Sequence, residues 1–180
     1  MPRYVALLRG VNVGPKKRIR MDDLRGLVEG IGHTGVQTYV NSGNVVFSCP
    51  QPQDNVTLAA QIEEALSARH GLDVRVVARS GEELAGIVAN NPFPDIAATP
   101  KLLHVSFLGD TPDAALVAAL AGVKKGDDDY RVVGQDVYLH YPNGISGAVF
   151  MVNGFDKALQ ATSTSRNWRT VVKLAEMAAK

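Results

Sequence analysis

The order of the apolar segments constrains this chain most, because the same succession of strand, helix, hairpin and helix occurs twice. Residues 90–100 contain three prolines and separate the two occurrences. The order β-α-β-β-α-β is typical of the split βαβ, or ferredoxin-like, arrangement. We therefore predict an α+β fold of two ferredoxin-like βαββα(β) subdomains, with antiparallel sheets packed into one body. The predicted ranges are 1–92 and 101–180, the latter including a terminal helix, with 93–100 as the connection.

The elements of the first half follow from apolar periodicity and from residues that start or stop helices. Asp54 and the Ser80–Glu83 capping box each predict the start of a helix. The predicted strands are 4–8, 36–40, 44–48 and 73–78, and the first two predicted helices are 21–31 and 54–71.

The second half repeats the pattern with shorter helices. Thr111 and Pro112 resemble a cap followed by a proline in the first turn of a helix that stops at Gly122. The predicted strands are 103–108, 130–133 and 137–141, and two further helices are predicted near 155–159 and from about 163 to 178. In a ferredoxin-like sheet, strands 103–108 and 137–141 should be neighbours.

Both faces of the first predicted strand are apolar. Tyr4, Ala6 and Leu8 alternate with Val5 and Leu7. A sheet with one face in water would show polar residues at every second position. The sequence therefore predicts that both faces are covered, most simply by the other half of the chain.

Composition excludes several classes of protein. The 19 basic and 18 acidic residues nearly balance, so any binding to nucleic acid requires a local cluster. Cys49 is the single cysteine, which excludes an internal disulfide and fits a reducing compartment. No apolar run approaches the ~20 residues of a membrane span, and no signal peptide is recognisable. We expect a cytoplasmic protein without a membrane partner.

The loop at residues 9–18 is the first candidate binding segment. Two glycines allow main-chain N–H groups to approach a ligand, and four basic side chains accompany them. The loop has neither a Walker A nor a dinucleotide-binding pattern. Its alternative interpretation is a structural turn with a solvated basic edge. The candidate ligand-binding residues in it are Arg9, Asn12, Lys16 and Lys17.

The segment 162–167 is the second candidate, since it is predicted to start the last helix. Its hydroxyls can cap that helix, but four in succession, followed by a guanidinium and an amide, exceed what capping requires. Free N–H groups, the helix dipole and an arginine suit a phosphate or carboxylate. The candidate residues are Thr162, Arg166 and Asn167.

The turn at 41–44 is the third candidate. Asn and Gly tolerate the left-handed conformation of a tight hairpin, and this explains the motif economically. Ser42 and Asn44 are nevertheless candidate ligand contacts. Ser42 lacks the context of a hydrolase nucleophile.

The histidines do not predict a metal site. His104 and His140 lie on strands expected to be adjacent and could share a face of the sheet, but no third ligand is evident. A buried hydrogen-bonded pair is the alternative. The acidic run 127–129 lacks calcium-loop spacing and is interpreted as a solvated turn. No metal and no cofactor are predicted.

Four motifs, from one end of the chain to the other, resemble a known family. They are LLRGVNVG at 7–14, TYVNSGNVVF at 38–47, YLHYP at 138–142 and ATSTSRNWRT at 161–170. In this combination they resemble the domain-of-unknown-function 1697 family. The resemblance implies a small bacterial cytoplasmic protein of two α+β subdomains, and it implies no established activity.

Three functions are compatible with these observations. The first is binding of an anionic ligand, such as a nucleotide, a phosphate or a nucleic-acid segment, between the 9–18 loop and the 162–167 helix start. The second is an enzyme of unknown reaction at the same site, although no nucleophile and base can be assigned. The third is a structural or partner-binding protein in which the motifs form only turns and caps. We predict the first.

Overall fold

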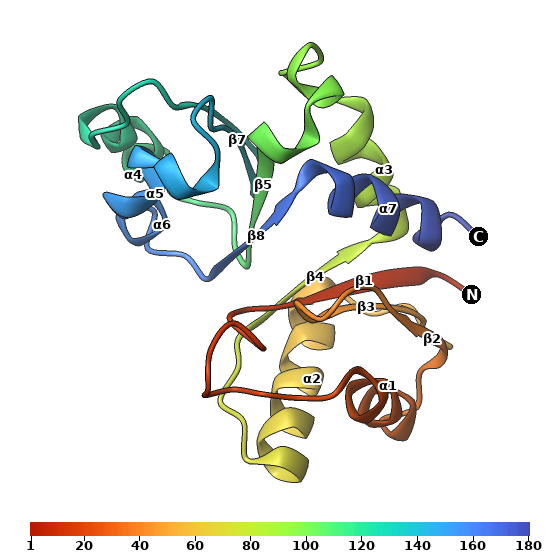
Figure 1. The fold of residues 1–180 in the computed structure, drawn as a ribbon. Helices are drawn as coiled ribbons and strands as arrows, with labels where there is room; N and C mark the ends of the chain where they lie inside the picture. The colour runs from red at the N-terminus through yellow and green to blue at the C-terminus, as the bar shows by residue number, and fades with distance from the viewer. The chain divides into compact units, whose positions relative to one another are not determined.

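The computed structural model describes residues 1–180, which divide into two compact units. The first unit comprises Met1–Gly86 together with Lys173–Lys180, and the second comprises Ile87–Val172. Each contains one four-stranded antiparallel sheet, which confirms the predicted α+β class (Figure 1). The predicted boundaries at residues 92 and 101 stay a prediction.

The sheet of the first unit has the strand order β2-β3-β1-β4, with all neighbours antiparallel. This order is that of a ferredoxin-like sheet, because β1 and β3 lie side by side in its centre. The elements are β1 (Arg3–Leu8), α1 (Met21–Gly30), β2 (Thr34–Thr38), β3 (Asn44–Ser48), α2 (Asn55–His70), β4 (Val76–Ser80) and α3 (Gly81–Ala89).

Helices α1 and α2 cover one face of this sheet (Figure 1). The core between them includes Ala6, Leu8 and Phe47 from the strands and Leu24 and Ile62 from the helices. Val5 and Leu7 point to the opposite face and are also fully buried. The absence of polar alternation in the sequence of β1 thus reflects a strand buried on both faces.

Two of the predicted helix starts in this unit are formed as expected. Asp54 caps α2 by accepting a hydrogen bond of 2.8 Å from the N–H of Thr57. Before α3, the N–H of Ser80 donates to Glu83 at 2.6 Å, and the N–H of Glu83 donates to the Ser80 hydroxyl at 3.1 Å. This reciprocal pair is a capping box.

The sheet of the second unit has the order β6-β7-β5-β8, which repeats the topology of the first. The predicted pairing of the strands near 103–108 and 137–141 is confirmed, since Val105 lies opposite Tyr138. The elements are β5 (Leu103–Leu108), α4 (Ala114–Ala119), β6 (Asp129–Val133), β7 (Asp136–His140), α5 (Val149–Val152), α6 (Phe155–Ala158), β8 (Ser163–Asn167) and α7 (Trp168–Ala178). From Lys173 onward, α7 belongs to the first unit.

The core of the second unit is aromatic near its short helices. Phe150 stacks between Tyr130 and Phe155, at ring-centroid distances of 4.6 and 4.9 Å. Stacked rings bury a large apolar area from few residues. This compensates for helices of only one or two turns.

The predicted start of the last helix at residues 162–167 is wrong. Residues 163–167 form β8, which pairs along five residues with β5, and α7 begins only at Trp168. The hydroxyl residues suit either a cap or a strand, because threonine packs well on a pleated surface. Pairing with β5, about 60 positions earlier in the chain, decides in favour of the strand.

Three smaller expectations also require correction. His104 lies opposite Leu139 and His140 lies opposite Leu103, so the two histidines occupy opposite faces of the sheet. The cap of α4 is Asp113 rather than Thr111: its carboxylate accepts a hydrogen bond of 2.8 Å from the N–H of Ala115.

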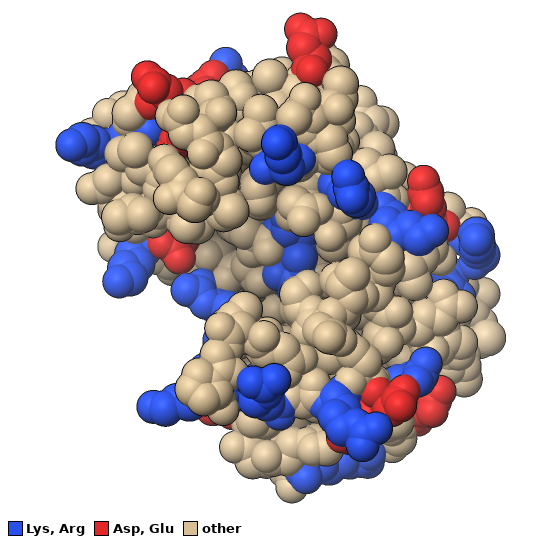
Figure 2. Space-filling view, in the orientation of Figure 1, with Lys and Arg blue, Asp and Glu red and all other residues tan.

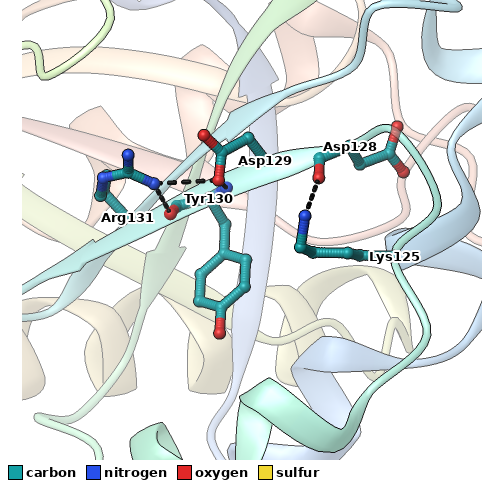
Figure 3. A network of polar contacts seen from close by, with 5 residues as sticks. All are labelled: Lys125, Asp128, Asp129, Tyr130 and Arg131. Atoms are coloured by element: carbon teal, nitrogen blue, oxygen red, sulfur yellow. Dashed lines mark hydrogen bonds and ion pairs between the residues drawn. The ribbon is translucent and has the colours of Figure 1, made fainter.

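The third correction concerns the acidic run, which is not a fully solvated turn. Asp128 is buried and accepts a hydrogen bond of 2.8 Å from the N–H of Phe150. Its carbonyl oxygen also accepts from the Lys125 ammonium at 2.9 Å (Figure 3). In the next strand the Arg131 guanidinium donates to Asp129 at 2.9 Å. These contacts fold the loop onto the core.

No helix combines the length and the apolar character needed to cross a membrane.

Candidate functional site

A polar cavity of about 500 Å³ lies at the N-terminus of α1 in the first unit. Its walls come from the loop after β1, the first turn of α1, the turn between β2 and β3, and the last residue of α2. The lining residues are Asn12, Arg18, Ile19, Arg20, Met21, Asp23, Asn41 and His70. Segments from three parts of the sequence thus meet here.

Asn12 holds this cavity together. Its side-chain amide donates to the carbonyl oxygens of Ile19, at 2.9 Å, and Asn41, at 2.8 Å. Its side-chain oxygen accepts from the N–H of Ile19 at 3.0 Å. The main-chain N–H of Asn12 donates to the carbonyl oxygen of Lys17 at 3.1 Å. The amide therefore closes the loop on itself and ties it to the hairpin turn.

The basic side chains of the cavity are Arg18 and Arg20, and both are exposed. Arg18 donates only a long hydrogen bond, of 3.5 Å, to the carbonyl oxygen of Gly14. Asp23 supplies the single carboxylate of the lining. The cavity thus carries a net positive charge without any contribution from His70.

The start of α1 has no side-chain cap. Arg20 occupies the N-cap position in an extended conformation, and its side chain accepts nothing from the first turn. The first helical bond runs from the N–H of Leu24 to the carbonyl oxygen of Arg20 at 3.0 Å. The N–H groups of the first turn and the positive end of the helix dipole favour negative charge, and Asp22 and Asp23 in the first turn supply part of it.

The turn residues proposed as ligand contacts are used by the turn itself. Asn44 is fully buried, and its amide donates to the carbonyl oxygen of Tyr39 at 2.9 Å and to the Ser42 hydroxyl at 3.0 Å. The carbonyl oxygen of Gly43 accepts from the N–H of Leu8 at 2.8 Å. Neither Ser42 nor Asn44 lines the cavity. Their contacts position Asn41, which does.

Of the predicted residues in the 9–18 loop, only Asn12 lines the cavity. The N–H of Arg9 donates to the carbonyl oxygen of Arg75 at 2.9 Å, at the side of β4. Lys16 and Lys17 are exposed and lie outside the lining.

Arg20 and His70 also line the cavity, and neither is among the residues predicted from the sequence to bind a ligand. Arg20 immediately precedes the amphipathic helix α1, which has no Ser, Thr, Asp or Asn cap. The absence of a capping residue at this position can be recognised from the sequence. No pattern in the sequence relates His70, at the end of α2, to the start of α1.

The second predicted segment is extended and is largely occupied by its own contacts. Thr162 accepts from the N–H of Gly109 at 2.8 Å through its carbonyl oxygen. The Arg166 guanidinium donates to the Thr164 hydroxyl at 2.7 Å and to the carbonyl oxygen of Ser165 at 2.8 Å. Burial lowers the pKa of Arg166 to about 10. Asn167 caps α7 by accepting from the N–H of Thr170 at 3.0 Å. All of these residues belong to the second unit.

Strained backbone concentrates around the cavity of the first unit. The non-glycine residues with positive φ are Asn12 at 57°, Lys17 at 54°, Val40 at 50° and, in the second unit, Gln160 at 53°. Positive φ is uncommon for side-chain-bearing residues and is a genuine outlier for a branched one such as valine. Such strain persists where surrounding structure enforces it, often at ligand sites.

The charged side chains outside this cavity do not form a continuous surface patch of one sign. On the face shown in Figure 2, Lys and Arg side chains are interspersed with Asp and Glu. No cluster of three or more His, Cys, Asp or Glu side chains is placed to hold a metal ion.

Comparisons with known proteins show the family and the fold. No curated protein matches the chain. Among solved structures, the conserved bacterial protein SP0830 from Streptococcus pneumoniae is similar, with 20% sequence identity and a TM-score of 0.74. The match covers 98% of each chain, and at this identity it shows a common fold alone. Residues 1–138 match the family described as "Protein of unknown function (DUF1697)", and the chain belongs to this family.

Proposed function

We propose that this protein binds an anionic, phosphate-bearing ligand at the cavity formed by the start of α1, the 9–18 loop and the 41–44 turn. The observation that carries the proposal is that Arg18, Arg20 and the uncapped N-terminus of a ten-residue helix face one cavity. The two guanidinium groups and the helix N-terminus favour negative charge by different physical routes, and their effects add.

Guanidinium groups supply charge and directed donors. An arginine pairs with two phosphate oxygens through parallel N–H donors, and such charge-assisted bonds are about twice as strong as neutral ones. The helix start supplies main-chain N–H groups that need no rearrangement. Asp23 opposes an anion, so it favours ligands that can contact the arginines at a distance from its carboxylate.

The size of the cavity suits more than an inorganic ion. A volume of about 500 Å³ lies within the ordinary range for small-molecule sites. A single nucleotide therefore fits the proposal better than phosphate alone. A nucleic-acid segment presents the same phosphate groups as a nucleotide. Its affinity for the protein would fall more steeply as the salt concentration rises, because it contacts the protein through several phosphates.

A titration of the full-length protein tests the proposal. Isothermal calorimetry with ADP, with inorganic phosphate and with a short single-stranded oligonucleotide, at low and moderate salt, separates the three forms of ligand. We expect ADP to bind, and the double substitution R18A/R20A to weaken its binding at least tenfold.

Lys101→Ala is the matched control, since it removes an exposed positive charge from the second unit. Arg166→Ala in the same titration tests whether the second predicted segment takes part. The proposal is wrong if none of the three probes binds at low salt, or if R18A/R20A and K101A bind ADP as the wild type does.

A further inference from the structure

The positive charge of this protein is concentrated in the segment 9–20, which leads from β1 to the start of α1. Of the 19 basic and 18 acidic residues in the chain, this segment contains five basic residues and no acidic one, which leaves 14 basic and 18 acidic residues elsewhere. A local excess of +5 in a protein of net charge +1 attracts a polyanion to this segment in particular. The five residues, all of them exposed, are Arg9, Lys16, Lys17, Arg18 and Arg20.

Carboxylates of the protein do not neutralise the second half of this segment. Elsewhere in the same unit, Arg25 is paired with Asp22, and Arg75 is paired with Glu63 at 3.1 Å. The lysine and arginine side chains at positions 16–20 are in no such pair. Their charge is therefore available to a ligand.

The main chain that carries these cations is held in shape. The carbonyl oxygen of Lys17 accepts a hydrogen bond of 3.1 Å from the main-chain N–H of Asn12, and the Asn12 amide donates to the carbonyl oxygen of Asn41 at 2.8 Å. Pro15 fixes a further backbone angle between them. A loop that is ordered before its ligand arrives loses less conformational entropy on binding.

Two exposed valines flank the bond between Asn12 and Asn41. Val13 follows Asn12 in the chain and is 80% exposed, while Val40 precedes Asn41 and is 50% exposed. Their methyl groups can contact a base or a sugar ring, whereas inorganic phosphate and polyphosphate have no apolar surface to place against them. The segment thus offers both charge and apolar contact to a ligand.

We infer that the ligand of this site is a single-stranded nucleic acid, with one nucleotide in the cavity at the start of α1 and further phosphates on the 9–20 segment. The inference rests on the anion site proposed above and specifies its ligand. Lys16 and Lys17 directly precede Arg18 but lie outside the cavity, so one bound nucleotide does not account for them, whereas a longer strand does. An unpaired nucleotide can enter such a cavity, while a base pair is held within its stack.

Fluorescence anisotropy of a labelled single strand of about twelve nucleotides, titrated with the full-length protein, tests the inference. The dissociation constant is measured from about 50 to 200 mM salt and compared with that of ADP from calorimetry. We expect the strand to bind at least about tenfold more tightly than ADP at low salt. The logarithm of its association constant should fall with the logarithm of salt concentration with a slope of about −3, because each phosphate contact to a single strand contributes about −0.7.

The double substitution K16A/K17A separates the strand from the nucleotide. It should weaken binding of the strand at least about tenfold and make the salt slope shallower by about 1.4. Its affinity for ADP should stay within about twofold of wild type, since neither lysine lines the cavity, and retained ADP binding also shows that the variant is folded. K101A/K124A is the matched control: it removes two exposed lysines from the second unit and should bind both ligands as the wild type does.

Three results would overturn the inference and leave the anion site in place, provided that ADP still binds. They are a strand that binds no more tightly than ADP, equal binding of the strand by K16A/K17A and K101A/K124A, and equal competition by a duplex of the same sequence. Binding to phosphatidylserine vesicles in place of the strand, weakened by K16A/K17A, would assign the segment to a lipid surface instead. Failure of ADP, phosphate and the strand alike at low salt would remove the anion site itself.

Discussion

Val40 is a branched residue held in the left-handed region, at φ 50°, next to the turn that borders the proposed anion site. The conformation costs roughly 1–2 kcal/mol for an L-residue with a β-carbon, and Asn accepts it more readily. Val40 is half exposed, so its side chain adds little core packing in return.

We therefore expect Val40→Asn to increase the free energy of unfolding by about 1 kcal/mol. Urea denaturation monitored by circular dichroism measures this change. An unchanged or lower midpoint would show that the valine side chain stabilises the turn by contacts that outweigh the strain.

His104 makes stability depend on pH. It is buried in the sheet of the second unit beside the Tyr141 ring, with centroids 5.3 Å apart, and burial lowers its pKa to about 4. The unfolded chain binds a proton near pH 6.5, whereas the folded chain does not until about pH 4. Stability should therefore fall as the pH drops through this window, by up to about 1.4 kcal/mol per pH unit.

His104→Leu should remove this part of the pH dependence. Denaturant midpoints for wild type and variant at pH 7, 6, 5 and 4.5 give the comparison. We expect the difference between the two proteins to shift in favour of the variant by a total of about 2–3 kcal/mol over that range. A difference that does not vary with pH would show that His104 titrates as an exposed histidine does.

At the scale of elements, the β2–β3 turn and the loop after β1 are fitted closely to each other. Gly43 has φ 81°, and a β-carbon added to it would lie 2.6 Å from Val11 and 2.7 Å from Leu8. Gly134, in the turn between β6 and β7, also has a positive φ, but a β-carbon there would meet nothing within 4 Å. A comparison of alanine substitutions in the two turns therefore separates the cost of the positive φ from the cost of a steric clash.

Gly43→Ala should destabilise the protein by about 3 kcal/mol or more, through overpacking added to backbone strain. Gly134→Ala should cost only about 1 kcal/mol, from strain alone. Chemical denaturation of both variants measures the contrast. Equal losses would show that the turn and loop can separate without penalty, and the cavity at the start of α1 would then lack a fixed wall.

The strand β8 shows how an element is decided by its neighbour. Its residues alternate between buried and exposed, as in Thr164, Ser165 and Arg166, and they pair with the outer side of β5. The same hydroxyl-rich sequence would cap a helix equally well in isolation. Only Asn167 performs the predicted capping, one residue before α7 begins.

At the scale of the whole molecule, the chain leaves the first unit near Gly86 and returns to it at Lys173. The returning helix end meets the start of α3: a β-carbon on Gly81 would lie 2.9 Å from the carbonyl oxygen of Ala178. Gly86 lies in the same helix, and a β-carbon there would meet nothing within 4 Å. The C-terminal residues are thus part of the first unit rather than an appendage.

Gly81→Ala should destabilise the protein by about 1–2 kcal/mol, because the main chain at Ala178 must move. Gly86→Ala should instead stabilise it by about 0.5–1 kcal/mol, the ordinary gain in helix propensity. Thermal unfolding of both variants tests the contact. A stabilising Gly81→Ala would show that the end of α7 does not pack against α3.

The sequence alone determined the α+β class, the order of the elements in the first unit, the pairing of β5 with β7 and the resemblance to the family, because apolar periodicity, turn residues and recurring motifs are local signals. Asn12, one of the predicted ligand-binding residues, lines the candidate cavity, and its role in binding stays a prediction. Only the tertiary structure decided that 163–167 is a strand, and that Arg18, Arg20 and His70 line one cavity at the start of α1. It alone showed that His33 is buried without a partner. These features depend on contacts between residues tens of positions apart, whose free energies outweigh local preference and leave no periodic trace in the sequence.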